Sequence, residues 1–168
     1  MNRQVLVLGI GNVLNTDEGV GVHAIRKLRQ EFAEVEAAVA GVELQDGGTL
    51  GLSLLPLVEE ATHLLLLDAV DVGESPGTLV ELKKEQIPYQ GAMKLSQHQV
   101  TFQEVLGLAL IRKKLPEHLH VIGIQPASLA IGVDLSPEVQ AALPEMLNRA
   151  TRVLSAWGVN LLAAGEDI

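Results

Sequence analysis

Apolar runs of strand length alternate along the chain with segments of helical periodicity. Strands are expected at residues 5–8, around 37–44, and at 64–67, 79–82 and 119–122. Helices are expected at residues 20–32, from 101 to 111, and from 136 onward. This alternation is typical of an α/β fold with a mostly parallel sheet. Because no internal repeat or linker interrupts the pattern, we expect residues 1–168 to form a single three-layer domain, a central twisted sheet flanked by helices.

Local chemistry predicts how several of these elements begin and end. The four consecutive leucines at 64–67 suit a central strand that is covered on both faces. Thr101 is followed three residues later by glutamate, which is the spacing of a helix capping box. Ser136 and Pro137 are typical of an N-cap and a first helical position. Pro144 is then expected to kink or restart the last helix.

Composition and charge exclude several functional classes. The chain has no cysteine, which rules out disulfides, zinc–thiolate sites and thiol nucleophiles. Its formal net charge of -9 argues against a basic surface for nucleic acid or for anionic lipid. The first apolar run is too short for a signal peptide or a membrane span. We therefore expect a cytoplasmic enzyme or binding domain, with no nucleic-acid partner and no membrane insertion.

The first expected strand runs directly into a glycine-rich turn at residues 9–21. A dinucleotide-binding turn has the spacing G-x-G-x-x-G, and Leu14 stands where its third glycine belongs. The turn then delivers Asp17 and Glu18 to the start of a helix, where carboxylates would repel a phosphate. A cation, or a carbonyl group polarised by a cation, is the more compatible ligand.

Acidic residues follow three successive expected strands. Glu18 follows the first strand, Asp46 the second, and Asp68 and Asp71 the third. Acidic residues are common in turns and at helix starts, so each of them alone has an ordinary structural explanation. Asp68 fits that explanation least well, because a carboxylate directly after four leucines is costly to bury without a partner or a metal. Ligands collect at the carboxyl ends of strands in such sheets, which makes this edge the candidate site.

Position along the elements separates the five histidines. His63, His118 and His120 begin expected strands and therefore lie at the opposite edge of the sheet, and His23 lies near the polar side of the first helix. We interpret these four as structural or solvated residues. His98 differs because it lies in a polar segment just before a helix, from which its side chain can reach the carboxyl edge.

Glu18, Asp68 and His98 together form a candidate set of two carboxylates and one imidazole. Such a set suits a borderline divalent ion such as nickel, zinc or iron. The sequence contains no H-E-x-x-H motif, no G-x-S-x-G elbow and no Walker loop. Serine nucleophile chemistry and phosphate-loop chemistry are therefore disfavoured.

Seven segments in register give the chain a family resemblance. It resembles the nickel-iron hydrogenase maturation proteases through residues 7–14, 16–22, 46–49, 67–70, 76–78, 96–99 and 123–126. The resemblance implies an endopeptidase that removes a C-terminal extension from the large-subunit precursor of a nickel-iron hydrogenase once nickel has been inserted. It also implies that Glu18, Asp68 and His98 bind the metal, and it links Asp46 to function.

These implications give a specific mechanistic hypothesis of an aspartic or metal-assisted protease. Nickel held by the precursor docks against Glu18, Asp68 and His98, where it is a recognition signal and a possible Lewis acid on the scissile carbonyl. Asp46 either holds the tail or moves a proton, so Asp46, Glu18 and Asp68 are the candidate catalytic residues. The expected partner is the precursor itself, and the nickel is expected to come with it.

Two other functions stay open at this point. One is a self-contained metal-dependent hydrolase with its own bound ion. The other is a non-catalytic Rossmann-like nucleotide-binding module, which Leu14 and the adjacent carboxylates disfavour. The identity of the hydrogenase and the oligomeric state cannot be read from the sequence, and no obvious exposed apolar stripe predicts a partner surface.

Overall fold

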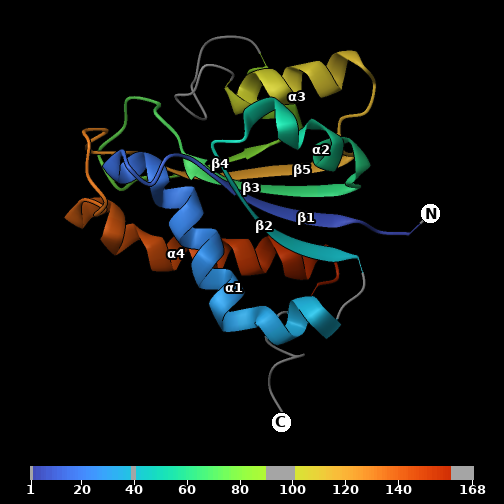
Figure 1. Cartoon of the computed structure of the whole chain (residues 1–168), viewed down its shortest axis with the longest axis horizontal. Helices are drawn as coiled ribbons and strands as arrows, with labels where there is room; N and C mark the ends of the chain where they lie inside the picture. The colour runs from blue at the N-terminus through green and yellow to red at the C-terminus, as the bar shows by residue number, and fades with distance from the viewer. Residues whose placement is uncertain (1, 39–40, 90–100, 160–168) are drawn as a thin grey trace.

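The chain folds around a five-stranded sheet with helices on both faces, as the computed structural model shows (Figure 1). The structure describes residues 2–38, 41–89 and 101–159. The strands are β1 (Val5–Ile10), β2 (Val42–Gly48), β3 (His63–Ala69), β4 (Leu79–Lys83) and β5 (His118–Ile124). The α-helices are α1 (Val20–Ala38), α2 (Leu55–Glu60), α3 (Phe102–Ile111) and α4 (Pro137–Ala156). Short 3-10 helices are η1 (Thr16–Gly19), η2 (Gly51–Leu54) and η3 (Lys84–Gln86).

Among the described strands the order is β2-β1-β3-β5-β4, and only β4 runs antiparallel to its neighbour. This arrangement confirms the expected mostly parallel sheet. β5 lies between β3 and β4, although both of these strands precede it in the sequence. The carboxyl ends of β1, β2, β3 and β5 therefore share one edge, which we call the carboxyl edge.

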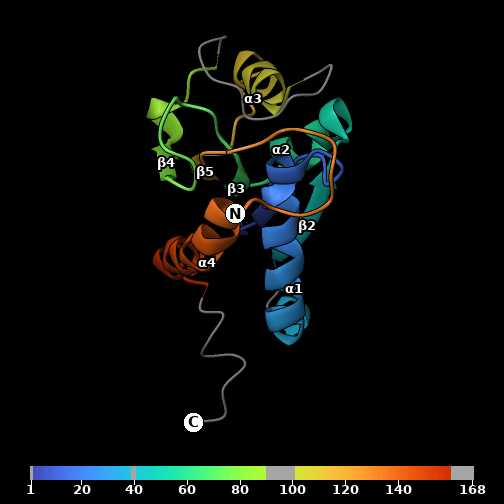
Figure 2. The same ribbon diagram turned by 90° about the vertical axis from the view of Figure 1, so that its left-hand side faces the viewer.

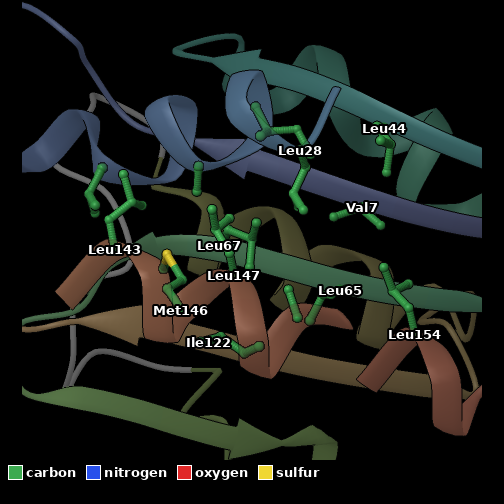
Figure 3. Packing of buried hydrophobic residues seen from close by; sticks show 14 of the residues in the cluster. Val7, Leu28, Leu44, Leu65, Leu67, Ile122, Leu143, Met146, Leu147 and Leu154 are labelled. Carbon is green, nitrogen blue, oxygen red and sulfur yellow. The ribbon is translucent and has the colours of Figure 1, made fainter. Parts of the chain in front are cut away.

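Helices cover the sheet in two layers, with α1 and α4 on one face and α2 and α3 on the other (Figures 1 and 2). Alternate strand residues point to opposite faces. Val7, Leu65 and Leu67 pack with α1 and α4, as Figure 3 shows. Leu64 and Leu66 belong to the second cluster, with α2 and α3.

All four leucines at 64–67 are fully buried, as expected for a central strand. Each buried leucine stabilises the fold by roughly 1.5 to 3 kcal/mol relative to an exposed one. Together they contribute an amount of the same order as the net stability of a typical domain, roughly 5 to 15 kcal/mol. This burial explains why the leucine run occupies the middle of the sheet.

Two expected boundaries were wrong. The second strand was expected around 37–44, but β2 begins only at Val42 because α1 continues to Ala38. The backbone of α1 departs from helical geometry at Phe32, where the helix was expected to end, and then resumes as a helix. In residues 33–38 glutamate alternates with alanine and valine, a pattern that is compatible with either structure, and the helix continues to Ala38.

Pro144 does not restart the last helix, because α4 is continuous from Pro137 to Ala156. Pro144 is exposed, whereas Leu143 and Leu147 are buried against the sheet. The carbonyl group that the proline leaves unpaired belongs to Gln140, an exposed residue, and access of water to that carbonyl would reduce the penalty of a proline inside a helix. The N-caps at Thr101 and Ser136 are confirmed, since both hydroxyls accept a backbone hydrogen bond from the first helical turn.

Candidate active site at the carboxyl edge

Four described loops meet at the carboxyl edge, namely residues 11–19, 49–54, 70–78 and 125–136. Figure 2 looks onto this edge and shows the segment between β5 and α4, in orange, passing across the start of α1. Hydrogen bonds join the loops. The backbone of Gly11 donates to Gly48, and that of Thr16 donates to Gly132. The loops thus form one continuous surface around the ends of the strands.

Glycines allow the start of α1 to lie against the ends of β1 and β3. A Cβ atom on Gly21 would lie 2.1 Å from the Leu67 carbonyl oxygen, a distance that no side chain tolerates. Gly11 has φ +132, and a Cβ atom there would lie 1.9 Å from the Glu18 carbonyl oxygen. The turn at 9–21 therefore serves close backbone packing, and this packing brings η1 next to the end of β3.

Asp68 is the most unusual side chain at this edge. It is fully buried, and its Oδ1 accepts a 2.8 Å hydrogen bond from the Ala69 amide. No described residue donates a hydrogen bond to its Oδ2. Burial raises the pKa of Asp68 well above its ordinary value, and the nearby charge of Glu18 raises it further. An under-coordinated buried carboxylate of this kind is a typical feature of a functional site.

Glu18 is the second carboxylate of the site and is only 5% exposed. It lies in η1, which packs against β3, and its charge acts on Asp68. The structure therefore brings together two of the three predicted metal-binding residues. His98, the third, lies outside the described residues. Within the described parts of the chain, three or more candidate ligands do not converge on one point.

Asp46 lies at the rim of the site rather than beside Asp68. In the sheet register, Gly9 of β1 pairs with Asp46 on one side and with Leu67 on the other. Two strand spacings of about 4.8 Å therefore separate the backbones of Asp46 and β3, roughly 10 Å in all. The Arg26 guanidinium donates a 3.1 Å hydrogen bond to the Asp46 carboxylate, whose side chain is 27% exposed.

Asp17 is completely buried and fastens the loop after β5 to the start of α1. Its Oδ2 accepts hydrogen bonds from the amides of Ala127 (2.8 Å) and Ser128 (3.0 Å) and from the Ser136 hydroxyl (2.8 Å). Its Oδ1 accepts a 2.7 Å bond from the Ser136 amide. Burial favours the neutral acid, but these bonds outweigh it and lower the pKa of Asp17. Asp17 is thus a structural clamp and not a metal ligand.

Thr16 reinforces this clamp with an unusual backbone conformation. Its φ is +47, which is rare for a residue with a β-branched side chain. The Thr16 hydroxyl donates to the carbonyls of Ser128 (2.7 Å) and Ala130 (3.1 Å). These bonds hold the strained residue in place, as is common next to functional sites.

Gln125 orders the loop after β3 in a similar way. Its side-chain oxygen accepts hydrogen bonds from the amides of Val72 (2.9 Å) and Glu74 (3.1 Å), and its amide donates to Asp71 Oδ1 (3.0 Å). The hydrogen bond that the Gln125 side-chain amide donates lowers the pKa of Asp71. Gln125 lies in one of the seven segments that carry the family resemblance, but no role was predicted for it. A polar residue directly after an apolar strand was the available signal.

The other histidines have the places that were expected, with one exception. His63 and His118 stack at 4.3 Å at the opposite edge, and His120 Nε2 lies 2.9 Å from Glu81. His23 was expected to be a solvated or satisfied surface residue, but it is half-buried and its Nε2 has no partner among the described residues. Burial, and then the charge of Arg26, lower the pKa of His23.

Known proteins share this sequence and fold. A sequence model described as hydrogenase maturation protease matches residues 22–153. The hydrogenase expression/formation protein HupD of Rhodobacter capsulatus is 44% identical over 161 residues, covering 95% of this chain and 75% of HupD. The hydrogenase 2 maturation protease of Escherichia coli is 34% identical over 160 residues, covering 95% of each.

A solved structure of similar architecture is the hydrogenase maturating endopeptidase HybD from Escherichia coli. It superposes with a TM-score of 0.81 at 32% identity and covers 94% of this chain and 95% of HybD.

Among the described helices, none combines the length and the apolar composition that crossing a membrane requires.

Proposed function

The chain belongs to the hydrogenase maturation protease family, and from this premise we propose that it removes a C-terminal extension from the nickel-loaded large-subunit precursor of a nickel-iron hydrogenase. In this proposal the nickel arrives with the precursor as part of the substrate. It serves as the signal that insertion is complete and as a Lewis acid on the scissile carbonyl. We further propose that the reaction takes place in the cytoplasm.

The pairing of Asp68 with Glu18 is the observation that supports this proposal most strongly. Asp68 Oδ2 lacks a donor among the described residues, and Glu18 adds a second acidic group close by. A divalent cation relieves both problems, because it replaces the missing donor and compensates the repulsion between the carboxylates. An imidazole beside two carboxylates also suits a borderline ion such as nickel, and we propose His98 for that position.

The protein's own residues have distinct tasks in this proposal. Glu18 and Asp68 hold the precursor's metal and so fix the scissile bond against the carboxyl edge. Hydrolysis adds the oxygen of water to the carbonyl carbon, breaks the amide bond, and transfers a proton to the leaving nitrogen. Asp17 and Gln125 keep the surrounding loops in one arrangement, which preserves the geometry during turnover.

Asp46 has two candidate roles, which are holding the tail and transferring a proton. Its position about two strands from Asp68 and its ion pair with Arg26 suit either role. The pH dependence of the Asp46→Asn variant separates them. Loss of one limb of the pH–rate profile indicates proton transfer, whereas a higher KM with an unchanged profile indicates tail binding.

The test is a processing assay on the precursor from the same source, loaded with nickel or free of it, with product mass as the readout. Cleavage of the loaded precursor alone is the expected result. Cleavage of both forms would favour a self-contained metal-dependent hydrolase. If neither form is cleaved and the protein binds a nucleotide, the nucleotide-binding alternative replaces the proposal.

Substitutions at the two carboxylates test the metal assignment. Glu18→Gln and Asp68→Asn keep the size of each side chain and remove its charge. Both variants should lose cleavage of the nickel-loaded precursor, with Glu60→Gln, an exposed acid at the end of α2, as the matched control. Full activity in either variant would refute the assignment for that residue.

A further inference from the structure

The carboxyl edge carries a cluster of apolar side chains that the sequence analysis did not foresee. Among the described residues, eight large apolar side chains are exposed, and two of them, Leu110 and Ile111, lie at the end of α3 near the opposite edge. The other six all lie in the four loops of the carboxyl edge. We call these six the apolar rim: Leu14, Leu50, Leu52, Val72, Ile131 and Val133.

Leu14, Ile131 and Val133 form the best-defined part of this rim. They are 59%, 92% and 62% exposed. The Gly132 amide donates a 2.9 Å hydrogen bond to the Leu14 carbonyl, and Gly132 accepts one from the Thr16 amide. A bridge between Asn15 and Gly132 aligns the two loops in parallel, so the backbone segments that carry these side chains lie next to each other. Grouped exposed aliphatic side chains of this kind mark interaction surfaces.

The charged side chains of the four described loops are all acidic, and Arg26 of α1, which pairs with Asp46, is the basic residue that the structure places beside them. The four described loops contain no lysine and no arginine, and residues 30–82 and 115–148 lack both throughout. Three exposed acids lie in the same loops: Asp71, Glu74 and Asp134. Basic residues instead gather toward the other edge, where Lys113 and Lys114 precede β5. An apolar surface with an acidic border fits a partner segment that combines apolar and basic side chains.

We propose that the apolar rim is the docking surface for the precursor, and that it binds an apolar, basic segment of the large subunit next to the metal-bearing site. This inference rests on the proposed function, because the rim lies in the loops of the same carboxyl edge as Glu18 and Asp68. A second copy of this chain is a poorer occupant, since two identical acidic edges repel each other. The rim then supplies affinity for the folded precursor, and the metal site reports whether nickel is present.

The test compares a rim variant with a control variant of equal chemistry. Leu14→Ser, Ile131→Ser and Val133→Ser are combined in one protein, and Leu110→Ser with Ile111→Ser is the control. All five side chains are exposed, so neither set removes buried packing. Steady-state processing of the nickel-loaded precursor gives kcat and KM for each protein. The rim variant should raise KM about tenfold or more with kcat within about twofold, and the control should leave both unchanged.

A second variant tests the electrostatic part of the inference. Glu74→Gln combined with Asp134→Asn should slow association with the precursor and weaken its dependence on salt, as measured by stopped-flow or surface binding. Association that keeps the wild-type rate and salt dependence would overturn the basic character assigned to the partner segment.

These experiments distinguish a failure of the proposed function from a failure of the docking inference. If the wild-type protein does not process the loaded precursor, the proposed function fails, and the docking surface fails with it. If the wild type processes the precursor and the rim variant keeps its KM, only the docking inference is overturned. If light scattering shows that the wild type is a dimer, and that the rim variant is a monomer with full activity, the rim is a self-association surface and the inference is also overturned.

Discussion

Replacing Asp68 with asparagine should make the free protein more stable while it abolishes processing. The variant keeps the acceptor for the Ala69 amide and removes the charge whose burial and proximity to Glu18 raise the pKa of Asp68. This single substitution should therefore lower processing activity and raise the free energy of unfolding. This is the expected behaviour of a site that is strained for its function.

The size of the effect follows from the coupling between protonation and folding. Between the ordinary aspartate pKa of 3.8 and the raised pKa in the fold, the folded protein binds one proton more than the unfolded chain. The free energy of unfolding therefore decreases as pH rises, by about 1.4 kcal/mol per pH unit. The stability from protonated Asp68 is fully present below pH 3.8 and is lost once pH passes the raised pKa.

Asparagine is neutral throughout, so the Asp68→Asn protein lacks this slope. Because the pKa of Asp68 lies well above its ordinary value, the variant should be more stable than the wild type at pH 7, and its advantage should grow as pH rises from 3.8 until pH passes the raised pKa. The measurement is urea unfolding of both proteins at several pH values in chelator-treated buffer. Glu60→Gln is the control, since it removes an exposed charge from the same acidic chain.

Two results would refute this reasoning. One is an equal pH slope in the wild type and the Asp68→Asn variant, which would mean that the carboxylate is not strained in the fold. The other is an equal gain in the Glu60→Gln control, which would assign the effect to the net charge of -9 instead of the buried site.

Three further predictions concern the scaffold of the site. Asp17→Ala leaves several buried donors without an acceptor, so it should lower the free energy of unfolding by about 3 to 5 kcal/mol in urea titrations, and unchanged stability would contradict the clamp. Gly21→Ala places a methyl group against the Leu67 carbonyl, so processing should fall at least about tenfold while circular dichroism still shows a folded protein; wild-type activity would contradict the close packing. Arg26→Gln breaks an exposed ion pair and should change thermal stability by less than about 1 kcal/mol, so a larger loss would show that the pair is structural.

Local sequence patterns predicted most of the strands and placed two acidic residues, Glu18 and Asp68, at the carboxyl edge. The four leucines at 64–67 identified the central strand, and the position of Asp68 directly after them identified the buried carboxylate. The boundary near 37–44 failed because its apolar spacing suits a helix as well as a strand. In that segment the choice depends on tertiary packing, which no local pattern contains.

Long-range contacts account for the features that were missed. The partners of Asp17 lie more than 100 positions away, so no spacing around Asp17 distinguishes a clamp from a ligand. The exposure of apolar side chains also depends on long-range contacts. Leu14 and Ile131 look like ordinary apolar residues in sequence, and only the arrangement of the loops places them on the surface together.

The insertion of β5 between β3 and β4 has a consequence for the chain as it leaves the ribosome. β3 pairs with β1 on one side and with β5 on the other, and β4 pairs with β5 among the described strands. Until residue 124 has been synthesised, the leucine-rich β3 has one open edge, and β4 has no strand to join. Nascent or truncated chains that end before this point expose an aggregation-prone edge, so their capture by chaperones should cease once β5 has emerged.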